Sequence, residues 1–200
     1  MKFLMEHELA FDTTELGFPS IQGCHAIVYQ TSAGLYGFHV AGGSADGDWD
    51  ANAKLLEDFV AVLGGLAHPG TRLYGSSFVG NNQRGYSGAP AAKWKQELVM
   101  FASKLAYTGR ISGYDLSRRF GGTDSAYVEY RVNGEKCDLH VRKWNRASEH
   151  PGRVTNPDRT NHQAKFRPSK SIPPTLQALV NVVPDVDRTG LAHVHKQCLR

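Results

Sequence analysis

A cysteine and a histidine fifteen residues apart are the side chains in this sequence best suited to chemistry. Residues 19–43, PSIQGCHAIVYQTSAGLYGFHVAGG, place Cys24 after a glycine at the head of one apolar run and His39 near the end of the next. A histidine beside a thiol converts it to a thiolate–imidazolium pair, and the thiolate is the nucleophile. Such a pair can attack a carboxamide or peptide carbonyl, and the imidazolium can then protonate the departing ammonia or amine.

The hairpin between the two residues decides whether their side chains can meet. Residues 24–30 and 35–41 are predicted strands around the polar turn 31–34. With Thr31-Ser32 as the loop, Cys24 lies directly across from His39. With 31–34 as the loop, Ala26 faces His39, and Cys24 becomes a diagonal neighbour at about 7–8 Å. Both loops are even in length, so both predict that thiol and imidazole project from one face.

The residues before Cys24 would shape the turn that carries the nucleophile. Gly23 allows a tight backbone conformation, so that amide N–H groups of the turn, which includes Gln22, can point at a developing oxyanion. A third group usually orients the histidine. The local polar candidates are Ser20, Gln22, Asp46 and Asp48, and a main-chain carbonyl could also serve. The alternative interpretation is a buried core thiol, since cysteine is among the most buried residue types.

The segment GCHAIVY…GLYGFHV resembles the nucleophile region of the protein-glutamine deamidases. This superfamily includes the chemoreceptor deamidase CheD and the catalytic domains of the cytotoxic necrotizing factor toxins and the Burkholderia lethal factor. In that family a small-residue turn delivers cysteine at the head of a strand, and the next strand carries histidine. The resemblance covers about residues 17–43, and the order of elements agrees to about residue 80. It implies a sandwich-like sheet flanked by helices, and cysteine chemistry without cofactor or metal.

The chain departs from the family pattern at two places. Residues 21–24, IQGC, stand where the toxins have Leu-Ser-Gly-Cys, and Phe18 stands where CheD and the lethal factor have a threonine. The resemblance therefore implies Cys24 as nucleophile and His39 as base. It leaves Ser20 or a backbone carbonyl as the third group.

The remaining elements predict an α+β fold. Apolar residues recur every three or four positions over 51–63 and 90–106, which predicts two helices, and 71–79 is a predicted strand. We expect a mixed or antiparallel, sandwich-like β-sheet flanked by these two main helices. Residues 1–144 would form a single catalytic domain.

A second hairpin is predicted over 125–144, with Asn133-Gly134 as its loop. Its alternation separates an apolar face from a polar one. The apolar face holds Val128, Tyr130, Cys137, Leu139 and Val141, and the polar face holds Glu129, Arg131, Asp138 and His140. We therefore predict a structural role for Cys137 and a solvated polar face.

Composition and cysteine usage limit the class of protein. Of 200 residues, 40% are hydrophobic and 21% are charged, as in soluble globular domains. Three widely spaced cysteines favour reduced thiols over a disulfide framework or a four-cysteine zinc site. The start lacks a signal-peptide core, and no apolar run is long enough to span a bilayer. We expect a bacterial cytoplasmic enzyme, or a toxin-like effector translocated into a target cell without a signal peptide.

Residues 145–200 are predicted to form a basic loop over 145–172, a short helix over 174–182 and a tail, packed on the domain or extending from it. Segment 142–170 carries eight Lys/Arg against two acids and could bind nucleic acid, anionic lipid or an acidic partner. It has no recognised nucleic-acid module, so a solvated loop is the preferred interpretation. The run from His193 to Cys198, HVHKQC, has metal-ligand types but no matching second pair, so we expect no metal site.

The function predicted from these patterns is a cysteine-dependent glutamine amidohydrolase that acts on a protein substrate. A cysteine protease or transglutaminase-like enzyme is the alternative within the same chemistry. A non-catalytic module that binds a partner through 142–170 is the alternative from another class.

Overall fold

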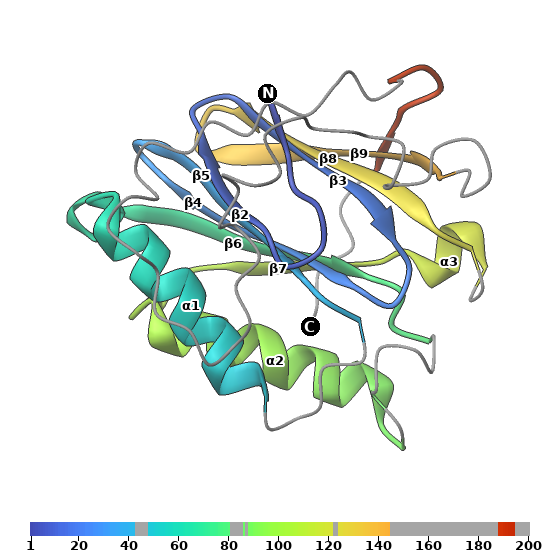
Figure 1. The fold of residues 1–200 in the computed structure, drawn as a ribbon, viewed down its shortest axis with the longest axis horizontal. Coiled ribbons are helices and arrows are strands. Elements are labelled where there is room, and N and C mark those ends of the chain that lie inside the picture. Colours follow the sequence, from blue (N-terminus) through green and yellow to red (C-terminus); the bar gives the residue numbers. More distant parts are fainter. Residues whose placement is uncertain (43–47, 81–85, 87, 122–123, 145–187, 195–200) are drawn as a thin grey trace, which may run out of the picture.

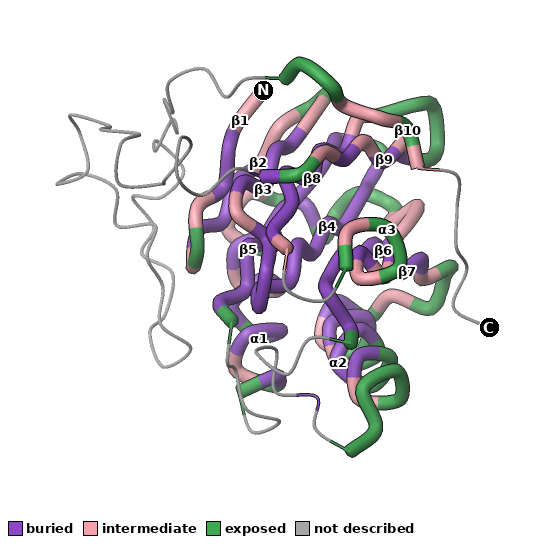
Figure 2. Tube along the Cα trace, turned by 90° about the vertical axis from the view of Figure 1, so that its right-hand side faces the viewer, coloured by how far each residue is buried: buried purple, intermediate pink, exposed green. Residues whose placement is uncertain are grey.

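The computed structural model describes residues 1–42, 48–80, 86, 88–121, 124–144 and 188–194. These residues form two five-stranded sheets that pack face to face, with two main helices on the outside of one of them (Figure 1). The view in Figure 2 shows the layers in order: first sheet, second sheet, helices. The expected α+β fold with two main helices is confirmed.

The first sheet has the order β1-β3-β8-β9-β10. The strands are β1 (Lys2–Phe3), β3 (Glu15–Ile21), β8 (Ala126–Asn133), β9 (Lys136–Lys143) and β10 (Ala192–Val194). β1 and β3 are parallel, and the other neighbours are antiparallel. Because β10 pairs with β9, residues 192–194 extend the edge of a sheet whose other strands all come from the first 144 residues.

The second sheet has the order β2-β5-β4-β6-β7. The strands are β2 (Leu9–Asp12), β5 (Gly34–Val40), β4 (His25–Thr31), β6 (Gly70–Ser77) and β7 (Ile111–Asp115). Only β6 and β7 are parallel within it. The helices are α1 (Trp49–Val62) and α2 (Pro90–Lys104), with the short η2 (Gly65–Ala67) and α3 (Ser117–Phe120) in the connections.

The central strand β4 is buried on both faces, which explains its continuous apolar sequence. Ala26 and Val28 belong to the core between the two sheets. Ile27 and Tyr29 belong to the core between the second sheet and the helices. The side chains on β4 therefore alternate between two separate cores.

The second hairpin forms, but its loop lies one residue later than predicted. Asn133 pairs with Lys136 and Val132 with Cys137, so Gly134 and Glu135 are the loop residues rather than Asn133-Gly134. Gly134 has φ 61°, as the first residue of a type II′ turn requires. The pairing shifts by two residues, so the two predicted faces keep their members.

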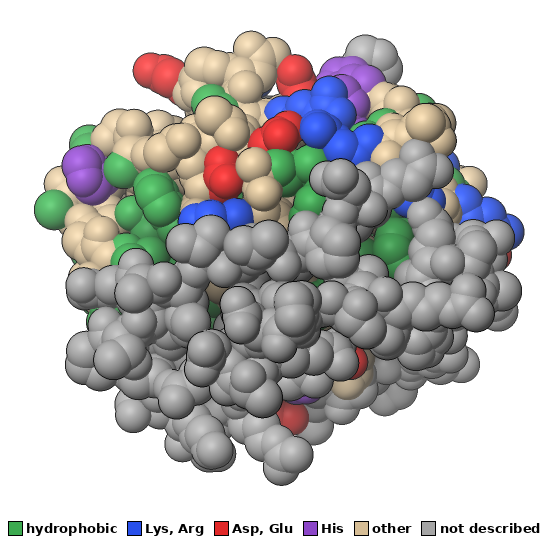
Figure 3. All heavy atoms as spheres, turned by 45° about the horizontal axis from the view of Figure 1, so that its top comes forward, with side chains coloured by type: hydrophobic (Ala, Val, Ile, Leu, Met, Phe, Trp, Pro, Cys, Tyr) green, Lys and Arg blue, Asp and Glu red, His purple; other side chains and the backbone are tan. Residues whose placement is uncertain are grey.

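The polar face of this hairpin is not fully solvated, contrary to expectation. Glu129 is completely buried against the Tyr127 hydroxyl, Arg131 and Arg188, and Arg188 also bonds to Glu15. Burial alone would raise the pKa of Glu129, but hydrogen bonds from Arg188, Tyr127 and Arg131 hold it below its usual range. On the described part of the surface in Figure 3, basic and acidic side chains lie beside one another.

The other predicted elements agree within a few residues. α1 covers Trp49–Val62 with Asp48 as its N-cap residue, and α2 begins at Pro90. The predicted loop 145–172 and helix 174–182 lie outside the described residues. No helix among the described residues is long and apolar enough to cross a membrane.

Candidate active site

The observed hairpin places Cys24 and His39 on the same side of the second sheet. Thr31 pairs with Gly34 and Ala26 pairs with His39, which is the register predicted from the 31–34 turn. Cys24 directly precedes β4 and is therefore a diagonal neighbour of His39. Cys24 lies in the core between the sheets with 8% of its surface exposed, and His39 is 2% exposed.

His39 is oriented by a main-chain carbonyl. Its Nδ1 lies 2.7 Å from the carbonyl oxygen of Leu4. A carbonyl can only accept, so Nδ1 carries the proton and Nε2 is the basic nitrogen of the neutral ring. This is the tautomer that a base acting through Nε2 requires. The Phe18 ring, 6.2 Å away between centroids, packs against the imidazole.

The turn between β1 and β2 also holds the backbone of His39. The His39 N–H donates to the carbonyl of Glu8 at 3.0 Å, and the His7 N–H donates to the carbonyl of His39 at 2.8 Å. β1 belongs to the first sheet and β2 to the second, so this turn crosses from one sheet to the other beside His39. His7 has φ 68°, a left-handed conformation that is uncommon for a residue with a side chain.

The backbone around Cys24 is confined from two sides. A Cβ on Gly42 would lie 3.0 Å from the carbonyl carbon and oxygen of Gly23, so the two glycines allow their segments to approach closely. The Ser77 hydroxyl donates to the carbonyl of Cys24 at 3.0 Å. Gln22 is buried beside them. The turn that carries Cys24 is thus held by packing and hydrogen bonding.

A carboxylate contacts the Cys24 thiol. Cys24 Sγ lies 3.6 Å from Oε1 of Glu6, and the same oxygen accepts the backbone N–H of Gly42 at 3.3 Å. Glu6 itself is exposed and belongs to the turn between β1 and β2. The thiol, a carboxylate and a backbone N–H therefore meet at one end of the sandwich, and the His39 imidazole projects from the same face of the second sheet.

Ser20 does not take the place that was predicted for it. The Leu4 carbonyl binds Nδ1 of His39 instead. Ser20 lies where the pairing of β3 with β8 shifts between Phe18 and Ile21, and it adopts φ 59°. Such a bulge re-aims the side chains around it. Of the other candidates, Asp48 is the N-cap residue of α1 and Asp46 lies outside the described residues.

A buried polar network lies next to Cys24 in the sequence, on the opposite face of β4. Nδ1 of His25 lies 3.1 Å from Glu97, and Trp94 donates its indole N–H to Nε2 of His25 at 3.1 Å. Tyr86 also donates to Glu97. Since an indole can only donate, Nε2 of His25 accepts and its Nδ1 donates to Glu97. This network ties α2 to His25, the residue that follows Cys24.

Three groups of the candidate site were missed by the sequence reasoning: the Leu4 carbonyl, the Glu6 carboxylate and the Gly42 N–H. Glu6 is 18 residues from Cys24 and Leu4 is 35 residues from His39. No local pattern links positions so far apart. The glycine pair at 42–43 was the one visible signal, because adjacent glycines permit close backbone approach.

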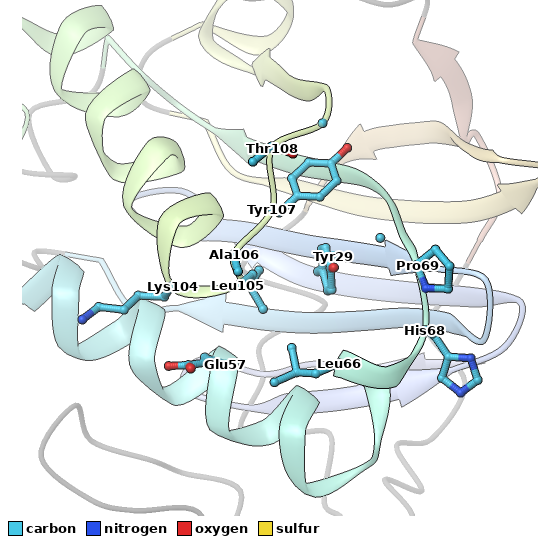
Figure 4. Close-up of a pocket in the computed structure, with 12 residues that line it drawn as sticks. Tyr29, Glu57, Leu66, His68, Pro69, Lys104, Leu105, Ala106, Tyr107 and Thr108 are labelled. Carbon is cyan, nitrogen blue, oxygen red and sulfur yellow. The ribbon is translucent and has the colours of Figure 1, made fainter.

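A separate hollow of about 530 Å³ lies away from this site. It is formed where η2 and the end of α2 meet β4 and β6, and Tyr29, His68, Lys104 and Tyr107 are among its lining residues (Figure 4). Lys104 also pairs with Asp50 at 2.8 Å. Gly70, another lining residue, pairs with Thr31 at the end of β4 opposite Cys24. This hollow therefore belongs to a different region from the thiol.

The structure gives no support for a metal centre among the residues it describes, where no cluster of three or more His, Cys, Asp or Glu side chains is suited to one. His193 belongs to β10 and lies 3.5 Å from Asp138. His195 and Cys198 of the predicted motif, and most of segment 142–170, lie outside the described residues.

No protein-family description and no curated protein sequence matches this chain. Its function is therefore inferred from the geometry of the site and from the resemblance of residues 17–43.

Proposed function

We propose that this chain is a cysteine-dependent amidohydrolase that converts a glutamine side chain of another protein to glutamate. The observation that carries the proposal is the hydrogen bond from Nδ1 of His39 to the Leu4 carbonyl, on the sheet face from which Cys24 also projects. It fixes the base in the tautomer that can take the thiol proton through Nε2.

The reaction would proceed in two steps. The Cys24 thiolate attacks the carboxamide carbon, and backbone N–H groups near the nucleophile turn stabilise the oxyanion. The C–N bond breaks as the His39 imidazolium protonates the leaving ammonia, which leaves a thioester on Cys24. Water, deprotonated by His39, then hydrolyses the thioester and restores the thiol. The balance is carboxamide plus water to carboxylate plus ammonium.

The binding-module alternative rests on segment 142–170, of which the structure describes residues 142–144. There Arg142 lies over the rings of Tyr127 and Trp144 at 5.4 and 5.5 Å.

The test measures the products formed from casein and from a cell lysate. A deamidase releases ammonia and converts glutamine to glutamate in intact chains, which peptide mass spectrometry locates. A protease would shorten the chains, and a transglutaminase would incorporate an added fluorescent primary amine. Ammonia release that persists in both Cys24→Ser and His39→Ala, or its absence from every substrate, would overturn the proposal.

A further inference from the structure

The contact between Glu6 and Cys24 has the form of a bound product. One carboxylate oxygen of Glu6 lies 3.6 Å from the Cys24 sulfur and accepts the Gly42 N–H at 3.3 Å. Glutamate is the product of glutamine deamidation. A substrate carboxamide bound here would likewise present its oxygen to the Gly42 N–H, and a small rotation would bring its carbon to the sulfur.

Glu6 is held in this position by the turn that also orients His39. The Met5 N–H donates to the carboxylate of Glu8 at 2.7 Å, and the Glu8 N–H donates to the carbonyl of Met5 at 2.9 Å. The left-handed residue His7 continues the turn and is bonded to the backbone of His39. The carboxylate of Glu6 is thus delivered by a folded segment that forms part of the site.

A carboxylate at this place opposes the first step of catalysis. Its negative charge disfavours the thiolate, and its side chain occupies the space from which a carboxamide must approach. Glu6 is exposed to solvent, so its side chain can rotate away from Cys24 while its carboxylate stays in contact with water.

We propose that Glu6 is an intramolecular product mimic that occupies the carboxamide subsite and restrains Cys24 until a protein substrate displaces it. The Gly42 N–H is then a donor to the oxyanion of the substrate. This inference rests on the proposed deamidase function, since it assigns the subsite by the chemistry of that reaction.

The substitution Glu6→Gln turns the mimic into a substrate. Glutamine has the same shape and places a carboxamide against the thiol. Attack by Cys24, loss of ammonia with a proton from His39 and hydrolysis of the thioester by water would convert the introduced glutamine back to glutamate. The purified variant should therefore revert to the wild-type mass over time, with one ammonia released per chain.

The experiment follows the introduced glutamine by peptide mass spectrometry in Glu6→Gln, Glu6→Gln/Cys24→Ser and Glu6→Gln/His39→Ala. Gln96, which is exposed on α2, serves as the internal control for spontaneous deamidation in the same digest. We expect conversion of the introduced glutamine in the first protein alone, while Gln96 stays intact in all three. If the glutamine of the single variant is lost no faster than Gln96, the assignment of the subsite is contradicted.

A second variant tests the restraint separately. Glu6→Ala should raise the rate of Cys24 alkylation by iodoacetamide by about tenfold, the order of effect of one neighbouring like charge. A rate equal to or below that of the wild type would overturn the restraint, and a lower rate would mark Glu6 as a base that assists the thiol.

The two variants together separate this inference from the proposed function. If casein or lysate proteins are deamidated equally by wild type and Glu6→Ala while the glutamine of Glu6→Gln persists, the Glu6 inference is wrong and the proposed function stands. If Glu6→Ala accelerates alkylation but neither that glutamine nor any substrate protein is deamidated, the restraint stands and the proposed function fails.

Discussion

Cys24, which precedes β4, and Cys137, on β9 beside the other end of β4, are similar in burial and differ in their surroundings. Cys24 precedes the first residue of β4, and Cys137 bonds to Gln30 near its last, with 8% and 6% of their surfaces exposed. Both belong to the core between the sheets. Burial alone therefore does not separate the thiol proposed as catalytic from the structural one.

The neighbours of each sulfur make the difference. Cys137 donates to the side-chain carbonyl of Gln30 at 3.4 Å, and its backbone N–H donates to the Tyr74 hydroxyl at 2.7 Å. Burial raises the pKa of Cys137 to about 12, so this thiol stays protonated at neutral pH. Cys24 instead lies at a confined turn and contacts Glu6, which also accepts the Gly42 N–H, and His39 projects from the same sheet face. These surroundings are the basis for proposing Cys24, and not Cys137, as the nucleophile.

Substitution of Cys24 and of Cys137 should give the largest difference in deamidation rate. Cys24→Ser should lower the deamidation rate by roughly 10⁴-fold or more, because the reaction loses its nucleophile. Cys137→Ser should keep the rate within about twofold of wild type, because a hydroxyl can still donate to Gln30. Ammonia release from casein under identical conditions measures both variants. Comparable losses in the two variants would remove the distinction between the thiols.

Removal of the imidazole should have the next largest effect. His39→Ala should slow deamidation by about 10²–10⁴-fold, the usual contribution of a positioned acid–base group. His140, on the outer face of the second hairpin, is the matched control, and His140→Ala should leave the rate unchanged. Circular dichroism checks that both variants fold. Full activity of His39→Ala would exclude this residue as the base.

Two glycine substitutions compare the backbone next to the Cys24 turn with the backbone of the second hairpin. Gly42→Ala should lower deamidation by about tenfold or more, because the added Cβ would press on Gly23 at 3.0 Å and shift the nucleophile turn. Gly134→Ala meets no atom within 4 Å but has φ 61°, so it should cost about 1 kcal/mol of stability and leave the rate intact. Kinetics should therefore show a lower deamidation rate for Gly42→Ala alone. Urea denaturation should show the lower free energy of unfolding of Gly134→Ala. An active Gly42→Ala protein would show that the close approach of the two segments is not needed.

The smallest expected effect concerns the pH dependence of stability at Cys137. Its pKa is about 12 in the folded chain against an ordinary 9.0, so above about pH 9 the unfolded chain loses a proton that the folded chain keeps. The free energy of unfolding therefore falls as pH rises, by about 1 kcal/mol between roughly pH 7 and pH 10 from this group.

Cys137→Ala removes that contribution and isolates it from other alkaline titrations. The stability difference between wild type and Cys137→Ala, measured by urea denaturation, should narrow by about 1 kcal/mol over the same pH interval. A difference that stays constant with pH would show that Cys137 titrates normally in the folded chain.

Sequence patterns predicted the elements better than the site. The α+β class, both main helices and the common face of Cys24 and His39 followed from periodicity and from the even length of the hairpin loop. The loop of the second hairpin was misplaced, because Asn133-Gly134 suits a type I′ turn while the chain uses Gly134-Glu135.

The groups that complete the site were out of reach because they depend on long-range packing. The Leu4 carbonyl and the Glu6 carboxylate reach His39 and Cys24 only because β1 and β2 join different sheets, and no short pattern in residues 1–12 indicates that. Burial of Glu129 was missed for a similar reason. Its partner Arg188 lies 59 residues further along the chain.

The relative reactivity of Cys24 and Cys137 in one folded protein tests the assignment of Cys24 as the nucleophile most directly. Isotope-coded iodoacetamide at neutral pH, followed by peptide mass spectrometry, gives both alkylation rates in one sample. We predict that Cys24 reacts at least about 10²-fold faster than Cys137, and that His39→Ala closes most of the gap. Equal rates at the two cysteines, or a Cys24 rate that does not change in His39→Ala, would contradict that assignment.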